Sequence, residues 1–204
     1  MLQATHIVQL QSDATARWHT PATPEPAPAS AWDDLILAQH RANFDLWHHE
    51  DAARDPQATG DTIAQHKHAI DTLNQCRNDL AEKMDVTLLA QAPPAADTVP
   101  LHSETPGMMI DRLSILALKR FHTAEEFHRA DATDAHRQRN RDRLSILDQQ
   151  IADLAQCLND LWTGVLAGRR RIKLYRQMKM YNDPELNPIL YRKTSVGDAT
   201  TNES

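Results

Sequence analysis

The chain has 204 residues, a formal net charge of −6 at pH 7 and only five glycines, with 41% hydrophobic and 25% charged residues. This length suits one domain with or without tails, and the scarcity of turn formers argues against β-sandwiches, barrels and glycine-rich nucleotide folds. The acidic balance argues against nucleic acid as a partner. No apolar run approaches the ~20 residues of a membrane span. Because Cys76 and Cys157 cannot build a disulfide scaffold and no signal-peptide pattern is present, we expect a cytoplasmic protein.

The chain begins with a predicted short helix at residues 3–18, where apolar residues recur at helical spacing. Four prolines between Pro21 and Pro28 then stop any helix and favour an extended linker. The last residues are small and polar, which is typical of disorder. We therefore expect an N-terminal helix (1–20), a proline-rich linker (21–29), a helical domain (30–192) and a disordered tail (193–204).

The helical domain shows capping residues followed by apolar residues three and four apart. The predicted helices run from Ser30 to about Arg54, from Thr59 or Asp61 to the loop before Pro93, from Pro106 to about Asp131, from Thr133 or Asp134 to Gly164 or Gly168, and from Arg169 to Tyr181. In the second of these, Arg77 interrupts an apolar seam that otherwise predicts core packing. The fold class is thus all-α: a bundle of four to five mostly antiparallel helices, with a short N-terminal helix and a flexible C-terminal tail.

A polar stripe on the helix after Ser30 is the first candidate site. An amide, an indole, carboxylates and a guanidinium recur along one face, and such groups are costly to bury unless they are paired. They are Asn43, Trp47, Glu50 and Arg54, with His48 and Asp51 beside them. The alternative is a structural Glu50–Arg54 ion pair at i,i+4 on a solvated face.

The start of the third domain helix is the second candidate. Free N–H groups at a helix start attract anions, Gly107 allows close backbone approach, and Arg112 and Lys119 supply positive charge. Thr105 caps the helix, and Asp111, Ser114 and His122 form a neighbouring polar stripe. The alternative is a well-capped structural helix.

A basic segment, Arg169–Tyr181, is the third candidate. Its cations and tyrosines suit phosphate and sugar-phosphate groups. The residues concerned are Lys173, Tyr175, Arg176 and Lys179. The alternative is a solvated basic face that balances the negative charge of the rest of the chain. RNA binding is a weaker alternative.

Eleven histidines could supply ligands for a metal. Asp45-x-x-His48 and Glu125-x-x-His128 echo the carboxylate-x-x-His pairs of di-iron bundles, but no fourth carboxylate partner is evident. Mg²⁺ held by Glu50, Asp51 and Asp111 is the metal site that we favour over it.

Three blocks of the sequence resemble a bacterial family known only as a domain of unknown function. The blocks are Asn43–Arg54, Ser103–Leu116 and Lys173–Pro184 with Asn187-Pro188. Trp18-His19 also has a counterpart in the family, so the resemblance covers roughly residues 3 to 192. The family is expected to be helical and is often encoded among glycosyltransferases for lipopolysaccharide and other surface glycans.

The resemblance implies that the three blocks form one composite site for a phosphorylated sugar or nucleotide-sugar. Glu50, Asp51, Asp111 and His48 are then the catalytic candidates. The ligand-binding candidates are Asn43, Trp47, Arg54, Thr105, Gly107, Arg112, Lys119, His122, Lys173, Tyr175, Arg176 and Lys179. We expect Trp47, Glu50, Asp111 and Lys173 to line one pocket.

Two other functions stay open. The first is a non-catalytic adaptor that docks a glycosyltransferase through the basic segment. The second is a metal-dependent all-α phosphoanhydride hydrolase. Whether it is an enzyme at all is left undecided by the sequence.

Overall fold

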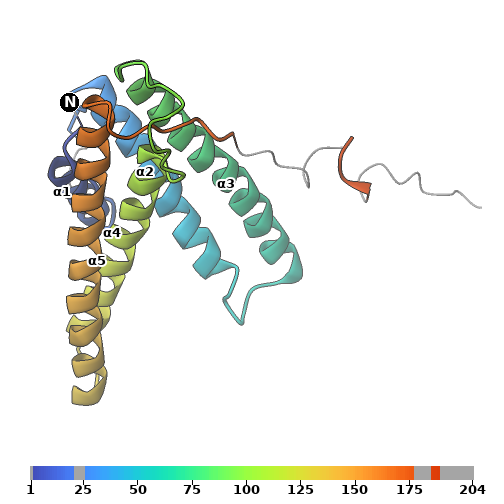
Figure 1. The fold of residues 1–204 in the computed structure, drawn as a ribbon. Helices are drawn as coiled ribbons and strands as arrows, with labels where there is room; N and C mark the ends of the chain where they lie inside the picture. Colours follow the sequence, from blue (N-terminus) through green and yellow to red (C-terminus); the bar gives the residue numbers. More distant parts are fainter. Residues whose placement is uncertain (1, 21–25, 177–184, 189–204) are drawn as a thin grey trace, which may run out of the picture.

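The computed structural model describes residues 2–20, 26–176 and 185–188. These residues form five helices and no strand, which confirms the predicted all-α bundle. The helices are α1 (Ala4–Trp18), α2 (Ala31–Ala52), α3 (Gly60–Leu89), α4 (Pro106–His128) and α5 (Asp134–Leu166) (Figure 1).

Hydroxyl caps fix the starts of α2 to α5, which confirms the predicted caps Ser30 and Thr105 and decides between the alternatives left open for α3 and α5. In each case the side-chain oxygen of a Ser or Thr accepts the backbone N–H three residues further on, which satisfies one of the unpaired N–H groups of a helix start. The caps are Ser30, Thr59, Thr105 and Thr133. Beyond the end of α5, Gly168 has a φ of 67°, a left-handed conformation that glycine adopts without a Cβ clash.

Two helical hairpins make up most of the molecule. Helix α2 packs mainly against α3, and α4 mainly against α5. The hairpins lie together at the top of Figure 1 and diverge toward their loops at the bottom. Helix α1 packs against α4 and also contacts α2 and α5, so it bridges the two hairpins.

The apolar core lies where the helices converge. Every helix contributes an apolar side chain with 0% of its surface exposed, and these residues are Ile7, Ile36, Met84, Ile110 and Leu158. Full burial of such a side chain stabilises the fold by about 1.5–3 kcal/mol.

The prediction of a helix at Arg169–Tyr181 is wrong for residues 169–176, because these residues form no helix. Arg171 instead lies beside Leu101 in an isolated parallel bridge, and its N–H donates to the Pro100 carbonyl (3.1 Å). The Arg171 guanidinium donates to the carbonyl oxygens of Asp97 and Val99 (2.9 and 2.8 Å). These non-local hydrogen bonds outweigh the helical propensity of the segment.

Other predictions fall partly outside the described residues. Residues 26–29 of the predicted linker have no regular structure, whereas 21–25 lie outside them. The rest of the predicted basic helix, 177–181, and the predicted tail, 193–204, also lie outside. Within the described ranges, none of the helices has the length and apolar character needed to cross a membrane.

Candidate functional site

A buried chain of hydrogen bonds joins α1, α2 and α4 through His40. Its Nε2 lies 2.8 Å from the Thr15 hydroxyl, which itself donates to the Gln11 carbonyl (2.9 Å). Thr15 therefore accepts from His40 Nε2–H, and His40 Nδ1 accepts from the Ser114 hydroxyl at 2.7 Å. Burial lowers the pKa of His40 from 6.5 to about 3, against a smaller opposing effect of the Gln11 backbone. His40 is thus neutral at physiological pH.

The chain of hydrogen bonds continues to Asp111 through Asn43. The Asn43 amide donates to Ser114 Oγ and to the Asp111 carboxylate, both at 2.9 Å. Gln39 donates to the same carboxylate at 2.6 Å. Arg77 of α3 lies 3.4 Å from Asp111 and donates to the Asn43 carbonyl oxygen at 3.3 Å. The amide nitrogen and the carbonyl oxygen of Asn43 are therefore both hydrogen-bonded to other residues of the protein.

Arg77 and Gln39 were missed as site residues by sequence reasoning. Arg77 lies on a seam that predicts core packing, and the structure places it where α3 faces Asp111. The sequence does carry one signal for Arg77, which is a cation at a position where the rest of the seam is apolar. Gln39 gave no signal, because its pairing depends on the approach of a helix 72 residues away in sequence.

The start of α4 is occupied by a carboxylate of the protein itself. Asp85 of α3 accepts from the Gly107 N–H at 2.7 Å and from the Thr105 hydroxyl at 2.5 Å. Burial raises the pKa of the Asp85 carboxyl, and these two hydrogen bonds oppose the increase. A Cβ on Gly107 would lie 2.3 Å from the Ala81 carbonyl oxygen. Thr105 and Gly107 therefore serve the close packing of α3 against α4.

Among the described residues, four cavities border α4, and each shares a lining residue with the next. Cavity A (630 Å³) lies between α4 and α5, and Lys119 links it to cavity B (400 Å³). Trp47 links cavity B to cavity C (340 Å³), which also touches α2 and α3. Arg77 links cavity C to cavity D (350 Å³), and Arg112 links cavity D back to cavity A.

Most of the candidate residues line this ring of cavities, and two of the cavities combine residues from different parts of the sequence. Cavity C contains Asn43, Trp47, Glu50, Asp51 and Arg54. Cavity D contains Thr105, Asp111, Arg112, Tyr175 and Arg176. Cavity B contains Trp47, Lys119 and His122.

Lys173 does not join the other members of the expected pocket. It lines a separate cavity of 440 Å³ with Pro93, Asp97 and Arg171. Trp47 and Glu50 share cavity C, whereas Asp111 lies in cavity D. One pocket for all four is therefore wrong. Lys173 lies apart because the segment after α5 is not helical, and Asp111 is held by hydrogen bonds to Gln39 and Asn43. Lys179 lies outside the described residues.

The carboxylates considered for Mg²⁺ are not gathered at one point. Glu50 pairs with Arg54 at 2.7 Å, Asp51 is exposed, and Asp111 is held within the buried network. Among the described residues, the one group of side chains close enough to share a metal ion consists of His19, His48 and His122.

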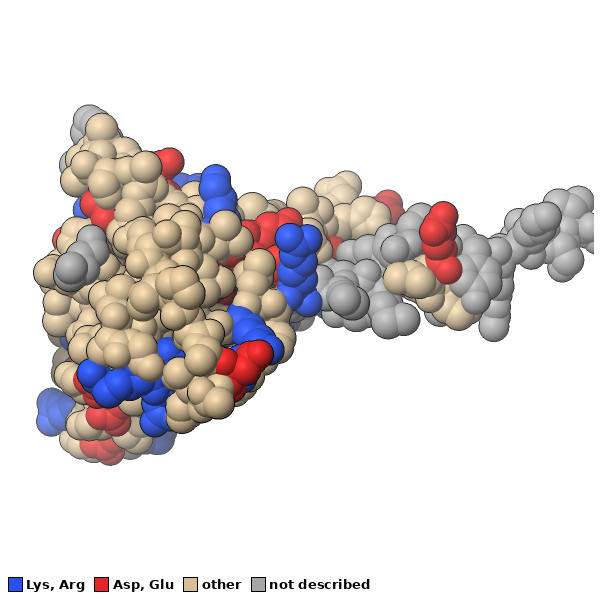
Figure 2. Space-filling view, turned by 45° about the horizontal axis from the view of Figure 1, so that its top comes forward, with Lys and Arg blue, Asp and Glu red and all other residues tan. Residues whose placement is uncertain are grey.

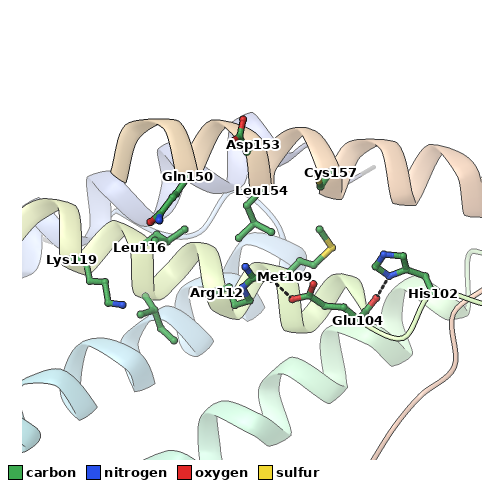
Figure 3. Close-up of a pocket in the computed structure, with 11 residues that line it drawn as sticks. His102, Glu104, Met109, Arg112, Leu116, Lys119, Gln150, Asp153, Leu154 and Cys157 are labelled. Atoms are coloured by element: carbon green, nitrogen blue, oxygen red, sulfur yellow. Dashed lines mark hydrogen bonds and ion pairs between the residues drawn. The ribbon is translucent and has the colours of Figure 1, made fainter. Parts of the chain in front are cut away.

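Lys119 differs from the neighbouring cation. Figure 3 shows Arg112 bound to Glu104, at 2.7 Å, whereas no interaction is drawn from Lys119. Within the described residues no carboxylate forms an ion pair with Lys119. Its ammonium therefore has no ion-pair partner there, and the residue lines both cavity A and cavity B.

The charged surface is mixed in sign. On the described part of the face in Figure 2, lysines and arginines are interspersed with acidic residues around a broad uncharged area. This face offers no wide cationic surface of the kind that nucleic acid binding requires.

One protein family matches most of the helical domain. The model of a family described as "Protein of unknown function (DUF4254)" matches residues 33–174. The match includes the first two sequence blocks, ends just inside the third, and excludes Trp18-His19. No curated protein and no solved structure matches the chain.

Proposed function

Because the chain belongs to the DUF4254 family, whose function is unknown, we propose a function from its own residues: binding of a phosphorylated sugar or nucleotide-sugar in the cavities around α4. The observation that carries the proposal is Lys119, a cation without an ion-pair partner among the described residues that lines both cavity A and cavity B. A phosphate group would complete its charge and hydrogen bonds.

The surroundings of Lys119 suit the rest of such a ligand. Trp47 lines cavities B and C, where its indole can stack on a sugar or a base. Arg54 adds a cation in cavity C, and Arg112 adds one in cavity A. Glu50 and Asp51 line cavity C, where they would meet Mg²⁺ brought in by a diphosphate.

We place this binding in the bacterial cytoplasm, in the synthesis of lipopolysaccharide or another surface glycan. The basis is the resemblance of the three sequence blocks to proteins encoded among glycosyltransferases. The observed residues support the ligand-binding part of this role. A reaction on the ligand would in addition need Glu50 or Asp51 as a base.

A thermal-shift screen against nucleotide-sugars and sugar phosphates, with and without Mg²⁺, tests the proposal. The best ligand is then titrated by calorimetry into Lys119→Gln and into the control Lys67→Gln, which removes an exposed lysine of α3. A charge-assisted hydrogen bond contributes about 1.5–3 kcal/mol, so Lys119→Gln should weaken binding by roughly 10- to 150-fold. The absence of any stabilising ligand, or equal affinities for the two variants, would exclude the proposed site.

A second candidate function is an adaptor that docks a glycosyltransferase. It is favoured by the segment after α5, where Arg171 is anchored while Lys173 and Tyr175 are exposed. In that case Tyr175→Ala should weaken binding to a purified glycosyltransferase of surface-glycan synthesis, and Lys119→Gln should not. The reverse pattern would leave ligand binding as the function.

A further inference from the structure

Three histidine rings that are far apart in the sequence meet, and one of them, His122, also lines cavity B. His19 follows the last residue of α1, His48 lies near the end of α2, and His122 lies in α4. Their ring centroids are 5.0–5.8 Å apart. One ring nitrogen from each lies within 4.8 Å of the other two.

The hydrogen bonds of these rings leave the same nitrogen available on each. His19 Nδ1 lies 2.8 Å from the Thr15 carbonyl, and His48 Nδ1 lies 2.8 Å from the Phe44 carbonyl. His122 Nδ1 lies 2.8 Å from the Glu125 carboxylate. These oxygens can only accept, so each Nδ1 carries the proton and each neutral ring has its lone pair on Nε2.

Two of these Nε2 atoms have no protein partner. The Nε2 atoms of His19 and His122 are buried, and within the described residues neither forms a hydrogen bond. Buried polar atoms are nearly always satisfied, and an exception points to a partner outside the chain, such as a water molecule or an ion. Two such atoms, on rings whose centroids are 5.0 Å apart, point to one shared ligand.

We propose that His19, His48 and His122 bind a transition metal ion, with Zn²⁺ as the expected metal. Imidazole nitrogen is a preferred zinc ligand, and zinc-bound histidines typically donate their other N–H to a carbonyl or carboxylate, as these three do. Nitrogens of a tetrahedral zinc site lie roughly 3.3 Å apart at ordinary Zn–N distances, so small ring movements would complete the site. All-nitrogen ligation distinguishes it from a Mg²⁺ site, which requires oxygen.

Each of the three histidine rings contacts another aromatic ring. Phe121 stacks on His19 at 4.2 Å between ring centroids, Trp47 stacks on His122 at 4.9 Å, and Phe44 contacts the His48 ring at 4.3 Å. His48 itself is exposed. Three protein ligands with a solvent-accessible side leave a fourth position for water or for an oxygen of a bound molecule, as in catalytic rather than structural zinc sites.

Co²⁺ is the probe for the experiment, because its visible absorption reports coordination directly. The full chain is stripped of metal with a chelator and titrated with Co²⁺, and Zn²⁺ is then added to displace it. We expect tight binding of about one equivalent with intense absorption of low-coordinate Co²⁺. His48→Ala should weaken binding at least tenfold while circular dichroism stays unchanged, because this side chain is exposed.

Two further variants test whether the three rings themselves hold the metal. Glu125→Gln keeps all three rings but weakens the acceptor at His122, and such outer partners typically contribute 10- to 100-fold in metal affinity. His68→Ala removes an exposed histidine of α3 outside the group and should bind Co²⁺ like the wild type. If His19→Ala or His122→Ala fails to fold, His48→Ala and Glu125→Gln still decide the question.

The proposal is overturned if the wild type gives no Co²⁺ spectrum, or if His48→Ala and His68→Ala titrate alike. It is also overturned if His66→Ala, and not His48→Ala, abolishes binding, because the metal would then lie at the separate His49–His66 pair, whose Nδ1 atoms are 2.8 Å apart. The Co²⁺ titration contains no sugar phosphate and the ligand titration contains no Co²⁺, so failure of the sugar-phosphate proposal and failure of the metal site are distinguishable.

Discussion

His40 lies between Thr15 and Ser114 in the middle of the bundle, where burial lowers its pKa from 6.5 to about 3. The unfolded chain takes up a proton at this residue below pH 6.5, whereas the folded chain does not until about pH 3. The unfolded state therefore binds more protons across this window, and stability is lost as pH falls through it, by up to ~1.4 kcal/mol per pH unit.

His40→Gln removes this titration while keeping a polar side chain. We expect the variant to be less stable than the wild type near neutral pH and to lose less stability on acidification. Urea unfolding of both proteins at several pH values between about 7 and about 5 measures the two slopes. Parallel slopes would show that His40 titrates alike in the folded and unfolded chains.

Glu50 is the second residue whose role can be separated from packing. Its partner Arg54 is 68% exposed, so the ion pair contributes little to the fold. Glu50→Gln should lower the free energy of unfolding by at most about 1 kcal/mol, measured by urea denaturation, while damaging function in the cell. A strongly unstable variant with intact ligand binding would make Glu50 a structural residue.

At the scale of elements, the contact between α3 and the start of α4 is unusually close. A methyl group at position 107 would meet the Ala81 carbonyl oxygen at 2.3 Å and the Asp85 carboxylate at 2.8 Å. Gly107→Ala should therefore destabilise the protein by about 1–3 kcal/mol, through separation of the helices and loss of hydrogen bonds to Asp85. Thermal and urea unfolding measure the change.

Gly60→Ala is the matched control for this substitution. Gly60 is the first residue of α3, and nothing lies within 4 Å of a Cβ placed there. Alanine at an unstrained helical position stabilises by about 0.4–1 kcal/mol, so the two substitutions should act in opposite directions. Equal effects would mean that Gly107 is not a packing requirement.

The helices themselves could be predicted because their signals are local. Ser30, Thr59, Thr105 and Thr133 mark their own helix starts, and apolar spacing marks the faces. The composition of the segment from Arg169 to Arg176 also predicts a helix, but its conformation depends on acceptors in the loop at residues 97–100. No local pattern indicates such distant partners.

The candidate site is predictable in the same uneven way. Trp47 and His122 are expected in one site and do stack, at 4.9 Å between their rings. The position of His19 beside His48 depends on how α1 crosses the bundle, which the spacing of residues within α1 does not specify. With eleven histidines in the chain, residue type alone could not select the three that meet.

At the scale of the whole molecule, Arg171 ties the segment after α5 to the loop before α4. Its guanidinium donates to two carbonyl oxygens and to the Asp97 carboxylate, and its side chain is 17% exposed. Arg171→Ala should destabilise the protein by about 2 kcal/mol through the loss of these hydrogen bonds.

Asp97→Asn tests which of these bonds matters, because the Asp97 side chain is 94% exposed. Removal of its charge should change stability by less than about 0.5 kcal/mol, since exposed ion pairs contribute little. Urea denaturation of both variants gives the comparison. A larger effect for Asp97→Asn than for Arg171→Ala would place the anchor in the ion pair and not in the carbonyl contacts.

The position of α1 also has a consequence for the order of folding. Each hairpin joins helices that are neighbours in sequence, so both can form early with little loss of chain entropy. The contacts of α1 are far more distant: Gln11 bonds to Ile110, and the Ala4 N–H bonds to Asn159, 155 residues away. Capture of α1 is therefore expected after the rate-limiting barrier, and substitutions in α1 should accelerate unfolding while leaving the refolding rate nearly unchanged.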